Sequence, residues 1–394
     1  MSLSEKDLLA KVPTGLYIGG KWVKGGAADA IAVEDPATGK VLLEIANANA
    51  ADGLAALTAA DDAQAKWART APRERAEILR RTFDLVRERS EEFAMLISLE
   101  MGKPIAEARG EVTYGNEFLR WFSEEAVRVS GRYGTSPEGT GRMLVAQRPV
   151  GPAFAITPWN FPLLIISQKL PFAIAVGCTA VVKPSQLTPG TTLMLGQYVK
   201  EAGIPDGVVN IVSGKGAVGG RISEHPDVDM VTFTGSTEVG KKVMQAAAGT
   251  LKKVGLELGG KNPQIIMADA DMEAAADAVV FGVYFNQGEC CNSGSRILVQ
   301  RSAAKKFMDI VVEKAKRVPV GDPLDEKVLV GAIASPEQQA TIERYVAEGK
   351  ASGANLVLGG SQINTEIGRY FEPTIFTGVT KDMSIAKEEI FGPV

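Results

Sequence analysis

The sequence predicts an α/β protein whose first domain is built on a parallel sheet with helices on both faces. The chain has 394 residues, which is too many for one hydrophobic core and indicates two or three domains. From Pro149 onward, short β-rich runs alternate with helical runs, a rhythm typical of parallel sheets. The same rhythm repeats after Gly259, which predicts a second α/β domain.

Before Pro149 the chain is expected to be mainly helical. Apolar residues recur at helical spacing, with charges between them, over 55–67, 73–89, 91–101 and 109–130. Glycines and a proline then interrupt any helix over 131–148, and a strand is expected at 143–147. We interpret 131–148 as a protruding arm or a connection between domains.

The alternating region supplies the elements of both domains. Strands are expected at 151–157, 179–182, 208–212, 230–233 and 254–257, with helices at 193–202, 216–225 and 236–248. After Gly259 the expected order is strand 264–267, helix 272–284, strand 297–300 and helix 303–317. Because ligands of such sheets bind at the carboxyl ends of strands, the functional residues are expected in the loops that follow them.

Composition argues against several classes of function. The net charge of −4 comes without a basic block, so no nucleic-acid partner is expected. The apolar run from Leu170 to Val182 is too short to span a bilayer, so no membrane association is expected. Three cysteines, two of them adjacent, indicate a reducing cytoplasm rather than a disulfide framework. The single histidine, His225, makes a multi-histidine metal site impossible, and no metal is expected.

A cysteine pair, Cys290 and Cys291, lies in a glycine-flanked run between a predicted helix and a predicted strand. A thiol at the end of an element lies near backbone N–H groups and helix dipoles, which favour the nucleophilic thiolate. The alternative is a buried structural pair, since cysteine is often a small core residue. Composition alone favours that alternative.

Two further residues have side chains suited to catalysis. Glu257 ends a predicted strand between two leucines and before two glycines, and burial there is expected to raise its pKa and suit it as a general base. Asn160 lies in the run TPWNFP, where two prolines fix the backbone and make its amide a rigid donor for a developing oxyanion. The alternatives are a surface carboxylate at a strand end and an ordinary aromatic loop anchor.

A possible phosphate site lies in the run from Phe233 to Gly240, which follows a predicted strand and opens a helix. Gly235 permits close approach of a ligand, and Ser236 with the first N–H groups of the helix suits a pyrophosphate. The run lacks the G-x-G-x-x-G pattern, so by itself it also fits an ordinary strand–helix turn.

At least six runs, in order between about residues 15 and 394, resemble motifs of the aldehyde dehydrogenase family. The resemblance implies that Cys291, three residues after Gly288, is the nucleophile, and that Cys290 occupies a variable position. It implies that Glu257, which lies 291 − 257 = 34 residues earlier, is the general base. It also implies that Asn160 holds the oxyanion, which removes the loop-anchor alternative.

The resemblance further implies a dinucleotide cofactor, NAD or NADP. Lys183 and Gln186 match the residues that contact the adenosine ribose, and Glu389 with Phe391 matches those that bind the nicotinamide ribose and pack the ring. The full cofactor set implied is Thr157, Trp159, Lys183, Gln186, Gly235, Ser236, Gly240, Glu389 and Phe391. The implied reaction oxidises a small aldehyde to a carboxylic acid through a cysteine thiohemiacetal and thioester.

The resemblance also divides the chain. It implies a Rossmann-like dinucleotide-binding domain over 1–130 and 149–259, an oligomerisation arm over 131–148 and a catalytic domain over 260–394. A homo-oligomer is implied for the full-length form. Chains of the family continue past the Glu-x-Phe motif, so we expect the C-terminal part of the fold to be missing and the catalytic domain to be incomplete.

The sequence differs from the family branch that it resembles most at the positions that would bind the substrate. The runs resemble the succinate-semialdehyde branch most, and that branch holds a substrate carboxylate with two arginines. The aligned positions carry Gln168 and Phe285, which supply no cation, and Ser293 replaces the redox-sensitive cysteine of that branch. We expect a neutral aldehyde to be preferred. The alternatives are a succinate-semialdehyde dehydrogenase, or an inactive truncated form with a structural or binding role.

Overall fold

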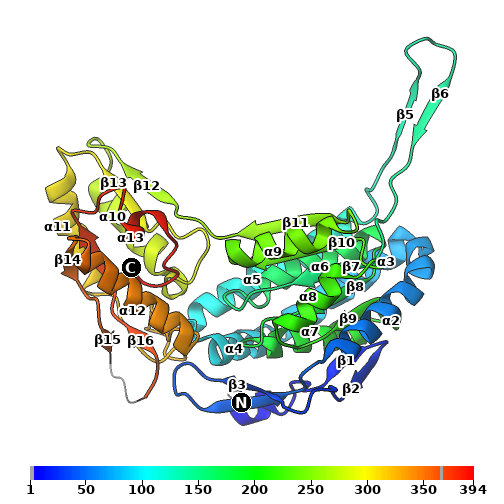
Figure 1. Cartoon of the computed structure of the whole chain (residues 1–394), viewed down its shortest axis with the longest axis horizontal. Coiled ribbons are helices and arrows are strands. Elements are labelled where there is room, and N and C mark those ends of the chain that lie inside the picture. The colour runs from blue at the N-terminus through cyan, green and yellow to red at the C-terminus, as the bar shows by residue number, and fades with distance from the viewer. Residues whose placement is uncertain (1–3, 364–366) are drawn as a thin grey trace. The chain divides into compact units, whose positions relative to one another are not determined.

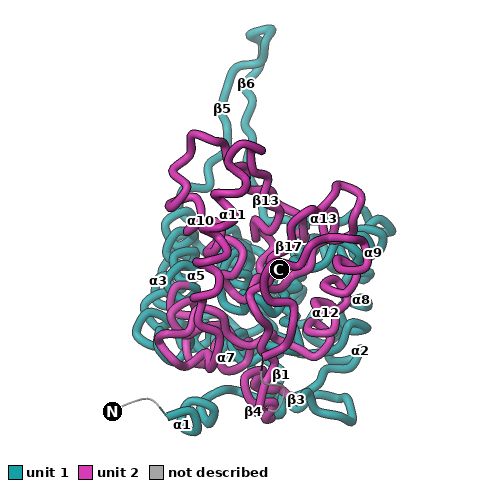
Figure 2. Tube along the Cα trace, turned by 90° about the vertical axis from the view of Figure 1, so that its left-hand side faces the viewer, with its two compact units in different colours: residues 1–32, 44–93, 111–257 teal, residues 33–43, 94–110, 258–394 magenta. Residues whose placement is uncertain are grey.

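The structure is a computed structural model that describes residues 4–363 and 367–394. It divides into two compact units, which Figure 2 colours separately. The first comprises Met1–Ala32, Glu44–Phe93 and Glu111–Glu257, and the second comprises Val33–Leu43, Ala94–Gly110 and Leu258–Val394. Segments 33–43 and 94–110, expected in the first domain, therefore cluster with the second unit. Residues 1–3 of the expected domain 1–130 lie outside the described residues.

Within the described residues, the first unit is built on a seven-stranded sheet in the order β11-β10-β7-β8-β9-β1-β2 (Figure 1). Its centre is parallel: β7 (Ala153–Ile156) pairs with β8 (Ala180–Lys183) and β10 (Met230–Gly235), and β8 pairs with β9 (Val209–Ile211). The expected Rossmann-like parallel sheet is confirmed. The first edge strand is β11 (Lys253–Leu258).

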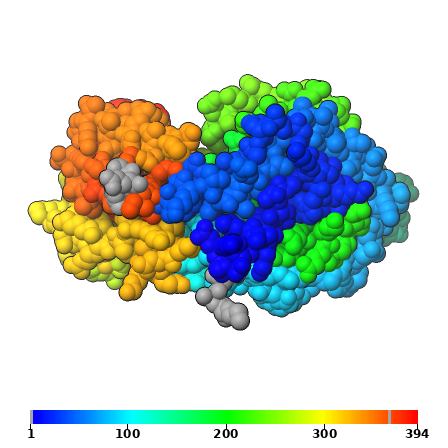
Figure 3. All heavy atoms as spheres, turned by 90° about the horizontal axis from the view of Figure 1, so that it is seen from below, coloured from blue at the N-terminus to red at the C-terminus, as the bar shows by residue number. Residues whose placement is uncertain are grey.

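The other edge consists of β1 (Leu16–Ile18) and β2 (Lys21–Val23), which the sequence analysis did not predict. Both pairings of β1, with β9 and with β2, are antiparallel. Strands of three residues carry too little alternation to be recognised from sequence. In Figure 3 the N-terminal residues, in dark blue, lie at the surface of the first unit.

Two groups of helices pack on this sheet and on each other, α2 with α8 and α3 with α6 and α7. Where helices were predicted, the structure confirms them. These are α2 Ala50–Arg69, α3 Pro72–Glu88, α4 Ser90–Met101, α5 Ile105–Glu125, α7 Pro189–Glu201, α8 Gly216–Glu224 and α9 Thr237–Ala248. The short helix α1 Glu5–Leu9 was not predicted, and residues 94–110, which include parts of α4 and α5, belong to the second unit.

Helix α6 (Leu164–Val176) was not predicted, and its composition explains why. Apolar side chains are buried around nearly all of its circumference, so the helix lacks the polar face that produces a 3.6-residue pattern. Pro171 lies inside it, which also argues against a helix from sequence. Gly177, with φ 88°, ends the helix in the left-handed conformation that favours glycine.

The expected arm is a β-hairpin. Strands β5 (Arg132–Thr135) and β6 (Arg142–Val145) pair in antiparallel register, and the hairpin extends away from the rest of the first unit (Figure 1). Its apolar side chains are exposed, among them Tyr133 and Leu144. None of the described helices is long and apolar enough to cross a membrane.

The second unit has an α/β core, as predicted. Strand β12 (Pro263–Ile266) pairs in parallel with β13 (Arg296–Val299), and helices α10 (Met272–Tyr284) and α11 (Ala304–Ala315) bury an apolar cluster with them. The remaining elements are α12 Pro336–Ala351, β14 Asn355–Leu358, β15 Gln362–Ile363, β16 Tyr370–Phe371, β17 Ile375–Thr377 and α13 Ser384–Lys387.

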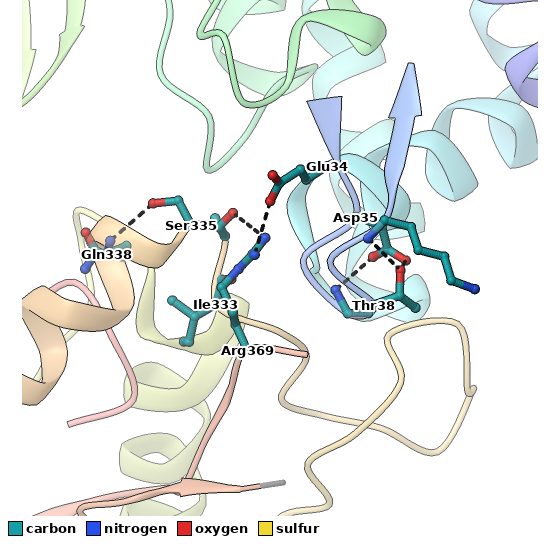
Figure 4. A network of polar contacts seen from close by, with 10 residues as sticks. Glu34, Asp35, Thr38, Ile333, Ser335, Gln338 and Arg369 are labelled. Carbon is teal, nitrogen blue, oxygen red and sulfur yellow. Dashed lines mark hydrogen bonds and ion pairs between the residues drawn. The ribbon is translucent and has the colours of Figure 1, made fainter. Parts of the chain in front are cut away.

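Polar contacts explain why the segment 33–43, which joins β3 (Ile31–Glu34) to β4 (Val41–Ile45), belongs to the second unit (Figure 4). The Arg369 guanidinium lies 3.4 Å from the Glu34 carboxylate and donates to the Ile333 carbonyl at 3.2 Å. The Arg369 backbone N–H donates to the Pro36 carbonyl at 3.1 Å. One arginine therefore ties three separate stretches of the chain together.

Candidate active site

The expected loops of the first unit leave the carboxyl ends of adjacent parallel strands. Ile156 at the end of β7 is paired with Lys183 of β8 and with Phe233 of β10, so the residues that follow emerge at one edge of the sheet. The Thr157 N–H donates to the Lys183 carbonyl at 3.1 Å, which links two of these loops. This arrangement was predicted from the alternation of strands and helices.

The loop that carries Asn160 is fixed by buried contacts. Thr157 and Asn160 are both 4% exposed. Trp159 is half-buried, and its carbonyl accepts from the Thr188 hydroxyl at 3.4 Å. The buried Glu111 carboxylate accepts from the N–H groups of residues 163 and 164 at 2.9 and 3.1 Å, where α6 begins. Asn160 therefore lies in a rigid turn between β7 and α6.

Lys183 and Gln186, at the end of β8, differ in environment. Lys183 is buried, and burial lowers the pKa of its ammonium group to about 8. A Cβ added to Gly219 would lie 3.2 Å from Lys183 Cδ, so glycine leaves room for the lysine stem. Gln186 is exposed.

The expected phosphate run joins β10 to α9. Ser236 is the N-cap of α9, and its hydroxyl accepts from the Val239 N–H at 3.4 Å. A Cβ on Gly235 would lie 2.6 Å from the Phe233 ring, so the turn requires glycine. Gly240 is buried one turn into the helix, and Ser236 is exposed.

Glu257 lies on β11, and the burial expected for it is wrong. Its side chain is exposed, because β11 is the outermost strand of its sheet and the neighbouring leucines leave the carboxylate open to solvent. Lys169 on α6, which the sequence analysis missed, is its electrostatic partner. Burial lowers the pKa of Lys169 to about 8, and the charge of Glu257 opposes that shift. The Lys169 ammonium donates to the Thr232 hydroxyl at 2.9 Å. A lysine inside the apolar run of α6 was the available signal.

In the second unit the two adjacent cysteines have different environments. Cys290 is buried and Cys291 is exposed. Burial raises the pKa of Cys290 to about 11, and its thiol donates to Asn292 Oδ1 at 2.8 Å. The Asn262 amide, which the sequence analysis also missed, donates to the Cys291 carbonyl at 2.9 Å. Cys290 is thus held as a neutral thiol, and Cys291 is presented to solvent.

The loop of Glu389 and Phe391 lies beside the cysteine run in the same unit. A Cβ on Gly288 would lie 2.1 Å from the Gly392 carbonyl, so the two backbones touch. A small cavity is lined by both segments, including Gly260, Gly288, Cys290, Ser293, Glu389 and Phe391. The structure therefore brings together the expected nucleophile run and the expected nicotinamide-binding pair.

Glycine and glutamine contacts shape this second loop. A Cβ on Gly259 would lie 1.9 Å from Glu389 Oε2, so glycine makes room for the carboxylate. Burial raises the pKa of Glu389, while the Gly260 N–H and Lys261 oppose the shift. Phe391 has φ 58°, the left-handed region, and the Gln338 amide donates to its carbonyl at 2.7 Å. Gln338 on α12 was not predicted.

The two positions expected to carry arginines in a succinate-semialdehyde enzyme hold neutral side chains. Gln168 is half-buried on α6 of the first unit. Phe285 is half-buried after α10 in the second unit, and its ring centroid lies 5.2 Å from that of Phe281. A larger cavity of about 670 Å³ in the second unit is lined by β13 and β17 and does not include Cys291.

Comparison with known proteins identifies the family. The model of the aldehyde dehydrogenase family matches residues 22–394. The chain belongs to the aldehyde dehydrogenase family. The family predicted from the six runs is therefore confirmed.

Similar proteins include enzymes named for semialdehydes. The chain is 45% identical to the succinate-semialdehyde dehydrogenase of Paenarthrobacter nicotinovorans, over 90% of this chain and 79% of that protein. It is 39% identical to a glutarate-semialdehyde dehydrogenase of Pseudomonas aeruginosa, over 96% and 78%. It is 38% identical to the succinate-semialdehyde dehydrogenase [NADP(+)] GabD of Escherichia coli, over 100% and 81%.

Two solved structures have the same fold over nearly the whole chain. The NAD-dependent aldehyde dehydrogenase of Sinorhizobium meliloti superposes with a TM-score of 0.95 at 44% identity, covering 98% of this chain and 78% of that one. The betaine aldehyde dehydrogenase of Staphylococcus aureus in complex with NAD+ superposes with a TM-score of 0.96 at 35% identity, covering 98% and 78%.

Proposed function

We propose that the chain catalyses the NAD- or NADP-dependent oxidation of an aldehyde to a carboxylic acid, with Cys291 as the nucleophile. The observation that carries the proposal is the contrast within the cysteine pair. Cys291 is exposed, while burial keeps the thiol of Cys290, which lines the small cavity beside Glu389 and Phe391, neutral. A thiolate is the attacking form of cysteine, so only Cys291 is suited to the role.

The described residues fit a dinucleotide. Ser236 and the first N–H groups of α9 suit a pyrophosphate, and the buried Lys183 ammonium and exposed Gln186 at the end of β8 suit a ribose. Glu389, in the small cavity beside the cysteine run, suits the hydroxyls of a second ribose. When bound, the nicotinamide accepts a hydride from the substrate carbon.

The residues of the chain perform the remaining steps. The Cys291 thiolate adds to the aldehyde carbon, and the Asn160 amide with the Cys291 backbone N–H stabilises the oxyanion that forms. Loss of hydride leaves a thioester on Cys291. Glu257 then removes a proton from water, whose oxygen attacks the thioester and releases the carboxylic acid and the thiolate.

Lys169 is proposed to assist Glu257. Its ammonium donates to the Thr232 hydroxyl, and the charge of Glu257 opposes the lowering of the Lys169 pKa by burial, so a cationic side chain lies near the proposed base. An acylating enzyme that passes the acyl group to coenzyme A is less well supported, because it would not require Glu257. A non-catalytic, purely structural protein would not require Glu257, Asn160 and an exposed Cys291.

Two substrate classes have specific support. Gln168 and Phe285 supply no cation for a carboxylate, which favours a neutral aldehyde. The names of the similar proteins, which include succinate- and glutarate-semialdehyde dehydrogenases, favour a semialdehyde that carries a carboxylate. We propose the neutral aldehyde first and succinate semialdehyde second. The exposed apolar hairpin is proposed as an oligomerisation arm.

The proposed roles separate by mutation. Cys291→Ala is expected to abolish hydride transfer, whereas Cys290→Ala, the matched control, retains it. Glu257→Gln keeps the size of the side chain but removes the base, so a burst of reduced cofactor, at most one per active site, should precede slow turnover. Stopped-flow absorbance at the reduced-cofactor band measures both. Steady turnover by Glu257→Gln at the parent rate excludes Glu257 as the base, and an acid-stable acyl label on Cys290 excludes Cys291.

A further inference from the structure

The backbone that leads into the cysteine pair has an unusual conformation. Helix α10 ends at Tyr284, and three consecutive residues then adopt left-handed dihedral angles: Asn286 (φ 55°, ψ 39°), Gln287 (φ 56°, ψ 19°) and Gly288 (φ 75°). Glycine adopts this region readily, but asparagine tolerates it less well and glutamine rarely occupies it. Surrounding contacts must therefore hold the first two residues in place.

The first left-handed residue is held by a carboxylate from a distant part of the chain. Glu107, in the first turn of α5, accepts a hydrogen bond from the Asn286 backbone N–H through Oε2 at 2.8 Å. The second is held by its own side chain, because the Gln287 amide donates to the Ala332 carbonyl at 3.3 Å. Both Asn286 and Gln287 are fully buried.

Downstream contacts continue the restraint toward Cys291. The Asn286 amide donates to the Glu289 carbonyl at 2.8 Å, and the Glu289 carboxylate accepts from the Ala334 N–H at 3.1 Å. The Asn262 amide then holds the Cys291 carbonyl. The backbone of Cys291 is thus restrained by the contacts of residues 286–289, which precede it, and by Asn262. Glu107 makes the first contact of the preceding segment.

Glu107 is not an ordinary first-turn acid. A glutamate there commonly points to solvent and interacts with the helix dipole. Glu107 is half-buried instead, and desolvation raises its pKa to about 7, with the Asn286 N–H and the buried Lys103 opposing the shift. Its negative charge also contributes to the raised pKa of Cys290, which indicates that it lies near the pair.

We propose that Glu107 is a positioning residue that sets the reactivity of Cys291 by holding the Asn286 backbone in its left-handed conformation. The inference rests on the proposed role of Cys291 as nucleophile. If the acceptor is lost, the Asn286 N–H loses its partner and the loop relaxes toward an extended or right-handed conformation. The backbone that leads to Cys291 then moves, and the thiol is no longer held in its position.

The test compares three replacements of Glu107. Glu107→Gln keeps the reach and an acceptor oxygen but removes the charge. Glu107→Asp keeps the charge but is one methylene too short, and Glu107→Ala removes both. Glu124→Ala, an exposed glutamate on the same helix, is the control. The readout is the rate of Cys291 alkylation by iodoacetamide at pH 8, with the labelled cysteine identified by peptide mass spectrometry, so it does not depend on turnover.

Glu107→Asp and Glu107→Ala are expected to slow alkylation of Cys291 roughly tenfold, the effect of one lost hydrogen bond to a charged group. Glu107→Gln and the control are expected to stay within about threefold of the parent, since an amide oxygen still accepts. The inference is overturned if the aspartate variant matches the parent, or if the glutamine variant is as slow as the aspartate variant. If the alanine variant does not fold, the glutamine and aspartate variants still decide.

Different results would refute the proposed function and the positioning role of Glu107. Loss of that function shows as turnover that survives Cys291→Ala, or as an acyl label on Cys290. Loss of the positioning role shows as alkylation of Cys291 that is insensitive to Glu107, whatever the turnover. If Glu107 had only a structural role, its variants would contain less folded protein, and the labelling rates of Cys290 and Cys291 would change together. A positioning role instead slows the labelling of Cys291 in protein that circular dichroism shows to be folded.

Discussion

Removing the side chain of Gln338 is expected to weaken cofactor binding by releasing the Glu389–Phe391 loop. The Gln338 amide donates to the carbonyls of Ile390 and Phe391 at 3.1 and 2.7 Å. Each half-buried hydrogen bond contributes about 1 kcal/mol, so Gln338→Ala removes about 2 kcal/mol of restraint. Phe391 holds φ 58°, which disfavours a residue with a Cβ by about 1–2 kcal/mol, so the released loop should leave this conformation.

A loss of about 2 kcal/mol corresponds to a roughly 30-fold higher dissociation constant for the cofactor. The assay is a fluorescence titration of NADH and of NADPH into each variant. Gln339→Ala is the matched control, because the neighbouring amide donates to the Glu343 carboxylate at the surface. Gln338→Glu has nearly the same size but offers no amide donor, so it should resemble the alanine variant. A Gln338→Ala protein that binds both cofactors within twofold of the parent refutes the reasoning.

Three further predictions follow from the same residues. Because Gln186 lacks the carboxylate that would repel a 2′-phosphate and Lys183 attracts one, NADP should be used at least comparably to NAD; a preference for NAD above roughly a hundredfold in kcat/KM contradicts this. Gln168→Arg combined with Phe285→Arg should shift kcat/KM toward succinate semialdehyde, and a strong preference of the parent for that substrate over neutral aldehydes of similar length defeats the pocket argument. The pKa of Glu107 rises from 4.5 unfolded to about 7 folded, so the folded state binds its proton more tightly and stability from this group falls as pH rises between those values. Urea titrations at pH 5 and pH 8 measure the free energy of unfolding of the parent and of Glu107→Gln. Relative to the variant, the parent should lose about 1 kcal/mol between the two pH values, after allowance for solvent screening. A gain in the free energy of unfolding of the parent over that range contradicts the raised pKa.

Much of the framework follows from local sequence pattern. The alternation of strands and helices predicted β7, β8, β9 and β10. It placed Asn160, Lys183 and Ser236 at or just after the ends of three of them, because parallel strands share one carboxyl edge. Helix α6 escaped prediction because its burial on nearly all sides removes the amphipathic period. The roles of the catalytic and cofactor residues came from resemblance to the family. The family model confirms membership of the family, and the roles of the individual residues stay predictions.

Environment could not be predicted in the same way. The sequence expected Glu257 to be buried among leucines, but a leucine on either side of a residue in a strand points to the opposite face and does not cover it. Cys290 and Cys291 are identical in chemistry and adjacent in the chain, and only their exposure separates them. Burial depends on what packs against a face, which local spacing does not state.

The contacts that hold the site are the other property that tertiary structure alone decided. Lys169 reaches Thr232 across 63 positions, Gln338 reaches Phe391 across 53, and Glu107 reaches Asn286 across 179. The sequence by itself determined the amphipathic helices, the central parallel strands, their order and the residue types that carry the chemistry, because those depend on periodicity and short motifs. Which distant side chain accepts from which backbone N–H depends on how the chain folds back on itself, and no single run of residues records that.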